Sequence, residues 1–190
     1  MATCDAADLQ HFRSISWCAD LLDDPAFIIT QTISRQYKSS TEDSLFAETL
    51  KTEDTISACV SMYRRPTTDV AHIDEVRTLL TLGYRLNGYP HVCHGGIVST
   101  IMDEVMGMLL SVNKDLEGAI VREATVTASL NVTFIKPVKT PGTVLVTAKF
   151  KDITGRKYFI ESSVRDANGV VLAKAEALWV GLNGSKEEKL

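Results

Sequence analysis

Hydrophobic and polar residues alternate with a period of two along much of the second half of the chain. Four segments show this alternation: 127–134, 143–150, 157–164 and 170–180. In the last of them, Ala173, Ala175 and Ala177 share one face, while Lys174 and Glu176 lie on the other. Such alternation predicts β-strands with one buried face.

Short turn signals separate the last three of these segments. Thr154-Gly155 lies between two of them, and Asn168-Gly169 precedes the final one. Asn-Gly is a strong signal for a two-residue hairpin. With residues 127–134 as the first strand, we therefore expect four strands joined in consecutive antiparallel hairpins.

A long apolar stretch, residues 91–110, precedes the four alternating segments and follows two others that also read as strands, 55–65 and 73–88. Gly95 and Gly96 suit the start of a helix better than its interior. Two strands, one apolar helix and then a run of strands predict an α+β fold. In this fold a curled antiparallel sheet would wrap around a long central helix.

The first fifty residues lack a strong strand pattern and contain two helix signals. Ser16 could cap a short helix that stops before Pro25, and residues 44–50 could form a second one. We therefore expect three parts: an N-terminal helical extension (1–50), a main domain (51–184) and a polar tail (185–190).

Composition fits a globular domain and narrows the range of partners. Of the 190 residues 45% are hydrophobic, and the net charge is -4. An acidic balance argues against nucleic acid, because phosphate binding needs concentrated Lys and Arg. The acidic first ten residues have no apolar run of the kind found in secretory signals, so we expect no such signal. We also expect no membrane span, because no apolar run reaches the roughly 18 residues that one needs. Four cysteines without a CxxC pair fit a reducing compartment. We expect a cytoplasmic protein that does not enter a membrane; mitochondrial and peroxisomal locations stay open.

The predicted central helix carries two adjacent carboxylates, Asp103 and Glu104, in apolar surroundings. Burying an ionised carboxylate without a partner is costly. Helical spacing places Asp103 on a stripe of small residues with Gly96, Ser99 and Gly107. Such a stripe suits a narrow gap beside a second subunit, where a carboxylate could act as base or nucleophile. The alternative is a structural carboxylate bonded to a neighbouring hydroxyl. Glu104 points elsewhere and is the second candidate.

The residues just before the helix could bind a metal or include a cysteine nucleophile, but their spacing disfavours both interpretations. His91, Cys93 and His94 are spaced too tightly for an ordinary structural zinc site. Neighbours in an extended segment point to opposite faces, so Cys93 and His94 should not pair. We expect neither a metal nor a cofactor.

Residues 91–107 resemble the signature of the hot-dog-fold thioesterases, in particular the PaaI-like acyl-CoA thioesterase group. That signature is His-Gly-Gly, followed seven residues after the second glycine by an acidic residue, and here Gly96 leads to Asp103 at that spacing. Residues 129–138 resemble the strand that follows in the group. The resemblance covers about 55–182. It implies a hot-dog fold and hydrolysis of an acyl thioester to a free acid and a thiol.

The resemblance also implies roles for particular residues. The implied site residues are Asp103, Gly95, His94 and Thr127 for catalysis, and Gly96, Asn87 and Ser99 for substrate binding. Asp103 would activate water or attack the carbonyl, and the Gly95 N–H would polarise the carbonyl. His94 would orient the carbonyl or the helix entrance, and the Thr127 hydroxyl would assist the water.

One position departs from the family pattern. Members often carry Asn or Gln six residues before the histidine, where this chain has Gly88, with Asn87 one residue earlier. Pro90 could mark an insertion that restores Asn87. Since the family's active site lies between subunits, the resemblance implies a homodimer or a dimer of dimers acting on acyl-CoA or a carrier-bound acyl group. The alternatives are a non-hydrolytic acyl-thioester binding protein and a hydratase or dehydratase of the same fold.

Overall fold

The computed structural model describes residues 5–66, 72–114, 116 and 119–182. The predicted polar tail, 185–190, lies outside these residues. The helices are α1 (Ala6–Arg13), α2 (Ser16–Leu22) and α3 (Gly95–Lys114), with short helical turns η1 (Ile33–Arg35), η2 (Leu45–Thr49) and η3 (Tyr84–Leu86). The strands are β1 (Phe27–Thr30), β2 (Ile56–Arg64), β3 (Glu75–Leu82), β4 (Asn87–Tyr89), β5 (Val92–Cys93), β6 (Thr125–Phe134), β7 (Gly142–Thr154), β8 (Lys157–Arg165) and β9 (Val171–Gly181).

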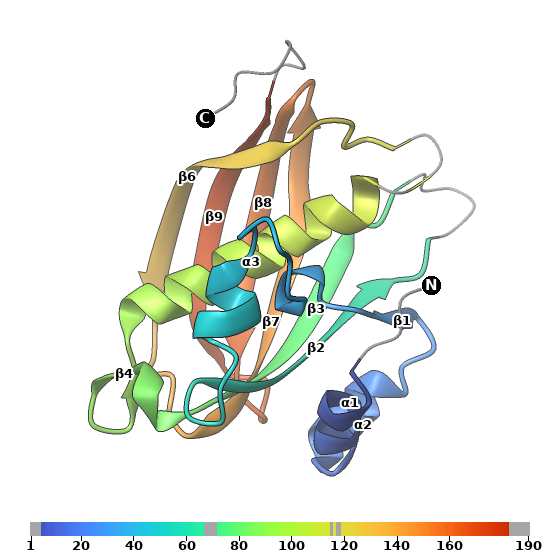
Figure 1. Ribbon diagram of the computed structural model, residues 1–190. Helices are drawn as coiled ribbons and strands as arrows, with labels where there is room; N and C mark the ends of the chain where they lie inside the picture. Colours follow the sequence, from blue (N-terminus) through green and yellow to red (C-terminus); the bar gives the residue numbers. More distant parts are fainter. Residues whose placement is uncertain (1–4, 67–71, 115, 117–118, 183–190) are drawn as a thin grey trace.

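Seven strands form one antiparallel sheet in the order β1-β2-β3-β7-β8-β9-β6, and α3 lies across its concave face (Figure 1). The apolar side of α3 is buried in the main core, with Ile101, Met102 and Leu109 fully or almost fully covered. The sheet supplies Val146 and Ala173 to the same core. This arrangement confirms the predicted α+β fold with a central helix wrapped by a curled sheet.

The helix α3 also has the length and mean hydropathy, 1.4, of a membrane-spanning segment. The expectation that no segment reaches this length was therefore too strict. A core helix wrapped by a sheet has the same properties, because it too must bury apolar side chains along most of its length.

The prediction of four strands joined in consecutive hairpins was wrong at its first step. The β7–β8 and β8–β9 hairpins are present, but β6 pairs with β9, and β7 pairs with β3. Residues 135–141 connect β6 to β7 and contain Pro137 and Pro141. This connection is too long for a tight hairpin, so the chain crosses from one edge of the sheet to the middle.

The N-terminal extension is not purely helical, because β1 adds a strand to the edge of the sheet beside β2. On the outer face, Phe12 of α1 and Cys18 of α2 form a second small core with Val60. On the face that carries α3, Phe46 and Leu50 join the main core. The extension therefore packs against both faces of the sheet at the β1–β2 edge (Figure 1).

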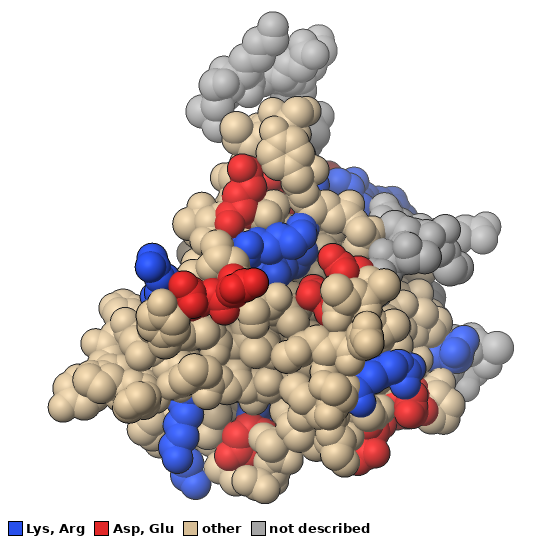
Figure 2. Space-filling view, turned by 60° about the horizontal axis from the view of Figure 1, so that its bottom comes forward, with Lys and Arg blue, Asp and Glu red and all other residues tan. Residues whose placement is uncertain are grey.

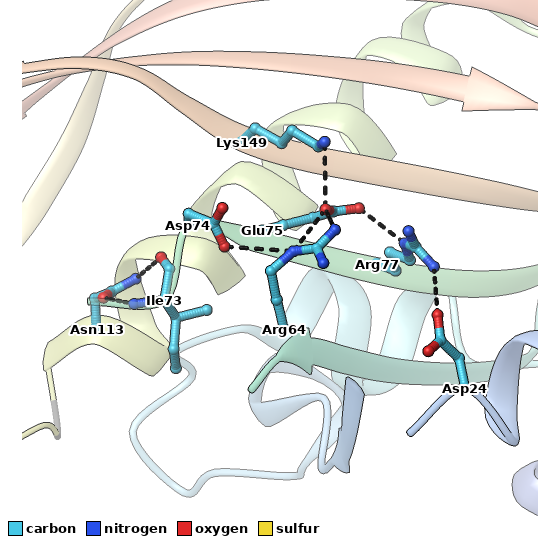
Figure 3. Close-up of polar contacts among 8 residues, drawn as sticks. All are labelled: Asp24, Arg64, Ile73, Asp74, Glu75, Arg77, Asn113 and Lys149. Atoms are coloured by element: carbon cyan, nitrogen blue, oxygen red, sulfur yellow. Dashed lines mark hydrogen bonds and ion pairs between the residues drawn. The ribbon is translucent and has the colours of Figure 1, made fainter. Parts of the chain in front are cut away.

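A charged network ties the extension to the sheet (Figure 3). Glu75 is only 2% exposed and pairs with Arg64 at 2.5 Å, Arg77 at 2.8 Å and Lys149 at 3.3 Å. Burial alone would raise the pKa of Glu75, but the hydrogen bonds from both arginines outweigh it and the net shift is downward. Arg77 also reaches Asp24 of the extension at 3.6 Å.

The C-terminal end of α3 is fixed by Asn113, which is fully buried. Its Nδ2 donates to the carbonyl of Ile73, and its Oδ1 accepts from the N–H of Ile73, both at 2.8 Å (Figure 3). A further bond at 2.8 Å runs from Nδ2 to the carbonyl of Leu109. The side chain thus provides hydrogen-bond partners for the backbone just before β3 and fixes the end of α3 relative to the sheet.

We predict that Asn113→Ala lowers the free energy of unfolding by about 2–4 kcal/mol, because it leaves the buried N–H and carbonyl of Ile73 without partners. Chemical denaturation measures this loss. Gln10→Ala, which removes an exposed amide side chain on α1, is the matched control and should change stability by less than about 0.5 kcal/mol. Equal stability of the two variants would contradict the assigned role.

Candidate functional site

The N-terminus of α3 is held in a fixed turn. The His94 N–H donates to the Leu86 carbonyl at 2.7 Å, and the Cys93 N–H to the Val138 carbonyl at 2.8 Å. The ring Nδ1 of His94 accepts from the Gly96 N–H at 2.9 Å, so His94 caps the helix. Gly95 is the first helical residue, and its N–H has no acceptor within the helix. The cap therefore occupies the Gly96 amide, and the neighbouring Gly95 N–H has no hydrogen-bond acceptor among the described residues.

The glycines at this turn allow close packing around it. A Cβ at Gly95 would lie 3.3 Å from the ring of Phe134, and one at Gly88 would lie 2.9 Å from the His94 ring. Phe134 is 56% exposed and lies beside the first turn of α3. Figure 2 shows that the left side of that view, where Figure 1 places β4 and the start of α3, is mostly uncharged.

Asp103 is half-buried, two turns along α3, and meets a hydroxyl from the sheet. The Thr127 Oγ donates to Asp103 Oδ1 at 2.9 Å. Burial raises the pKa of the Asp103 carboxyl above its ordinary value, and the hydrogen bond from Thr127 lowers it in part. The structure therefore joins two predicted catalytic residues, and it leaves Oδ2 of Asp103 able to accept from a water.

A β-bulge places Thr127 on the face that meets α3. Thr127 pairs with Trp179 and Ser129 pairs with Leu178, so Ala128 is the extra residue. Without the bulge, strict alternation would put Thr127 on the face opposite to Leu130. The strict alternation expected for residues 127–134 breaks at Ala128 for this reason.

Glu104 lies on the other side of α3, under the extension. Burial raises the pKa of its carboxyl, and the nearby Ser34 hydroxyl of η1 opposes the rise. The ion pairs among the described residues do not include Glu104. The two adjacent carboxylates are thus separated: Asp103 faces β6, and Glu104 faces the extension.

The side chains of Ser99 and Asn87, which were predicted to bind substrate, form hydrogen bonds within this chain. Ser99 Oγ donates to the Gly95 carbonyl at 3.1 Å, within the helix. Asn87 lies on β4, and its Oδ1 accepts from the Thr140 hydroxyl. The structure therefore holds Asn87 at the connection that follows β6, while Gly88 packs against His94.

Three comparisons with known proteins bear on this geometry. The family model of the thioesterase superfamily matches residues 91–173, which include the α3 turn, Asp103 and Thr127. Verlamelin biosynthesis protein B of Lecanicillium sp. is 29% identical over 164 residues, which is 72% of this chain and 71% of that protein. Residues 91–173 are therefore similar to the thioesterase superfamily. This match confirms the predicted resemblance and supports the predicted class of enzyme, while the PaaI-like group stays a prediction.

Two further relatives agree with the thioesterase assignment. Acyl-coenzyme A thioesterase THEM4 of Mus musculus is 31% identical over 105 residues, which is 55% of this chain and 42% of that protein. A solved thioesterase superfamily protein is 27% identical with a TM-score of 0.51, over 65% of this chain and 56% of the other. The chain thus spans less than half of the mouse protein.

Cys93 does not suit the role of a nucleophile. Its thiol is buried, which raises its pKa to about 11, while His94 beside it is exposed. Among the described residues, no three His, Cys, Asp or Glu side chains lie close enough to hold a metal ion.

Sequence reasoning missed two contributors to the site. Phe134 ends the alternating segment 127–134, and more than half of it is exposed beside Gly95. In the connection from β6 to β7, residues 138–140 pair with residues 91–93 and hold the turn before α3. The proline-rich composition of this connection was the available signal, because prolines exclude a simple hairpin there.

We predict that Asp103→Asn is at least as stable as the wild type at pH 7. The folded-state pKa of Asp103 is raised, so its contribution to stability falls as pH rises through that pKa, and the ionised form is disfavoured at neutral pH. Asn removes this cost and still accepts from Thr127. Thermal melts should show a Tm gain of a few degrees at most at pH 7, which shrinks below about pH 4. A clear loss of Tm at pH 7 would count against the assignment.

Proposed function

We propose that this protein hydrolyses an acyl-CoA thioester to a free acid and CoA. The observation that carries the proposal is the half-buried Asp103 carboxylate, which accepts a hydrogen bond from Thr127 and faces β6 within the segment that matches the thioesterase superfamily. The name of the mouse relative, an acyl-coenzyme A thioesterase, supports CoA as the thiol.

In the proposed reaction the carbonyl oxygen becomes an oxyanion in a tetrahedral intermediate. The free N–H of Gly95 and the partial positive charge at the start of α3 stabilise that charge. Asp103 takes a proton from the attacking water and returns it to the CoA sulfur as the C–S bond breaks. Alternatively, Asp103 attacks the carbonyl itself and expels the CoA thiolate, and water then hydrolyses the resulting anhydride. Thr127 holds one carboxylate oxygen so that the other is directed at the substrate. His94 contributes by capping Gly96 and fixing the turn.

One chain cannot supply both groups to the same carbonyl. Gly95 and Asp103 are eight residues apart on one straight helix, which separates them by about 12 Å along its axis. A reacting carbonyl needs the amide and the base each within about 3 Å. We therefore propose that the Gly95 amide of one subunit works with Asp103 of the partner subunit.

The free edge of β6 is where the second copy would pair. This strand is ten residues long, carries no charged residue, and pairs on one side only, with β9. Val126 and Phe134 on it are large, apolar and exposed. Edge strands usually avoid pairing through charge, proline or shortness, as the four-residue β1 does at the opposite edge. Antiparallel pairing of two β6 strands would place the two α3 helices side by side in opposite directions.

We predict that Asp103→Asn lowers kcat for acyl-CoA hydrolysis by about 10²–10⁴-fold, because the base is lost while the shape is kept. Release of free thiol over a panel of acyl-CoA esters measures this. Glu104→Gln is the matched control, since the neighbouring carboxylate faces the extension, and its kcat should stay within a few-fold of the wild type. Equal activity of wild type and Asp103→Asn would refute the proposed mechanism.

Mixing two inactive variants tests the shared site. Gly95→Pro removes the N–H at a helical position that tolerates proline, and Asp103→Asn removes the base. After the subunits are unfolded and refolded together in equal amounts, half of the dimers are mixed and each has one intact site. Activity should return to about a quarter of the wild type.

The controls for mixing are simple. Gly95→Ala keeps the N–H and should retain most activity, with its methyl group against Phe134. Each inactive variant refolded alone should stay inactive. If the mixture is no more active than either variant alone, the Gly95 amide and the Asp103 carboxylate of one site do not come from different chains.

A further inference from the structure

A hollow of about 190 Å³ lies within the N-terminal extension, where the extension meets β2. Its walls include Asp8 of α1, Arg35 of η1 and Cys59 of β2. Lys51, which follows η2, also lines it. This volume is many times what one water molecule needs, so the hollow has room for a small organic molecule. Because β1 and β2 lie at the edge of the sheet opposite to β6, the hollow is separate from the proposed thioester site at Asp103.

Arg35 brings a buried positive charge to the hollow, and its hydrogen-bond partners are neutral. It is only 6% exposed, and its guanidinium donates to the carbonyls of Phe46, Leu50 and Ile56 at 2.9 to 3.3 Å. The Nε atom is buried without a hydrogen-bond partner, and within the described ranges no ion pair includes Arg35. Burying a charge is costly unless an opposite charge compensates it. A ligand with an anionic group would supply that charge.

The hollow also carries a carboxylate that is not paired with this cation. Asp8 is half-buried, and its Oδ2 accepts from the Cys59 N–H at 3.1 Å. Burial raises the pKa of the Asp8 carboxyl, while the Cys59 N–H and the positive charges of Arg35 and Lys51 lower it in part. Asp8 therefore feels both cations, yet the ion pairs formed by the described residues do not include it. The two signs of charge thus line the hollow without meeting each other.

Lys51 adds a second positive charge on the Arg35 side of the hollow. Its Nζ donates to the Arg35 carbonyl at 3.0 Å, and its side chain is exposed. A simple anion in the hollow would be repelled by Asp8 and by Asp5, which also lines it. A simple cation would be repelled by Arg35 and Lys51. A small molecule that carries both signs of charge meets an opposite charge on each side.

We propose that this hollow binds an α-amino acid as its zwitterion, with the carboxylate towards Arg35 and Lys51 and the ammonium towards Asp8. An α-amino acid holds its two charges on neighbouring carbon atoms and is small enough for the hollow. The side-chain amides of Gln31 and Gln36 also line the hollow and can pair with a polar side chain of the ligand. The site therefore favours an amino acid with an uncharged polar side chain, such as glutamine or asparagine. This binding does not depend on the proposed hydrolysis.

The test titrates the whole chain with probes that differ by one charged group. L-Glutamine and L-asparagine carry both charges. Glutaric acid monoamide is glutamine without its ammonium, and 4-aminobutanamide is glutamine without its carboxylate. Calorimetric titration should show that at least one of the two amino acids binds. L-Glutamine should bind at least about tenfold more tightly than either single-charge probe, and at saturation it should raise the Tm by a few degrees.

Two variants locate the binding in the hollow. Asp8→Asn removes the negative charge but keeps an oxygen for the Cys59 N–H, and Lys51→Met removes a positive charge from an exposed side chain. Each should weaken amino-acid binding by about tenfold or more. The matched controls are Asp20→Asn on α2 and Lys174→Met on β9, both at exposed positions, and they should bind as the wild type does. Arg35 is left in place, because it also binds three backbone carbonyls.

Three results would overturn the proposal. The first is that neither L-glutamine nor L-asparagine binds. The second is that a single-charge probe binds as tightly as L-glutamine. The third is that Asp8→Asn and Lys51→Met bind the amino acid as well as their controls do. None of these measurements needs thioester turnover, so a failure here is distinct from a failure of the proposed hydrolysis.

Discussion

The separation of two groups on one rigid helix is the constraint on which the account depends. The start of α3 offers a free amide, and Asp103 offers a carboxylate, but the helix keeps them about 12 Å apart. Neither the sheet nor the extension bends α3 so as to bring them together, because the helix is fixed at both ends. His94 caps its first turn, and Asn113 binds the backbone at Ile73 at its last. A second copy of the chain is the simplest way to bring the two groups to one carbonyl.

The same helix shows why two carboxylates can lie side by side in an apolar sequence. Asp103 is directed towards β6, where the Thr127 hydroxyl meets it and where we propose that a second subunit pairs. Glu104 is directed under the extension near Ser34. The extension closes the opposite edge of the sheet with the short strand β1 and is pinned there by the network around Glu75. One edge of the sheet is therefore covered, and the other is left open for pairing.

Local signals predicted most of the elements, and non-local pairing explains what they missed. The alternation in β7, β8 and β9 and the small-residue stripe of α3 could be read from neighbouring residues alone. The pairing of β6 with β9, and the strand β1, depend on partners far along the chain, so no local period reports them. The meeting of Thr127 with Asp103 depends on a bulge at Ala128, and one residue of slip moves a side chain to the other face. The His-Gly-Gly turn was found by motif, but its helix cap required coordinates.

A crystal structure of the Asp103→Asn variant with an uncleaved acyl-CoA tests the central claim most directly. The account predicts a dimer paired through β6, with the thioester carbonyl oxygen about 3 Å from the Gly95 nitrogen of one subunit. The side chain at position 103 of the partner subunit should lie beside the carbonyl carbon. A thioester bound away from Gly95, or one whose carbonyl meets both positions within a single chain, would contradict it.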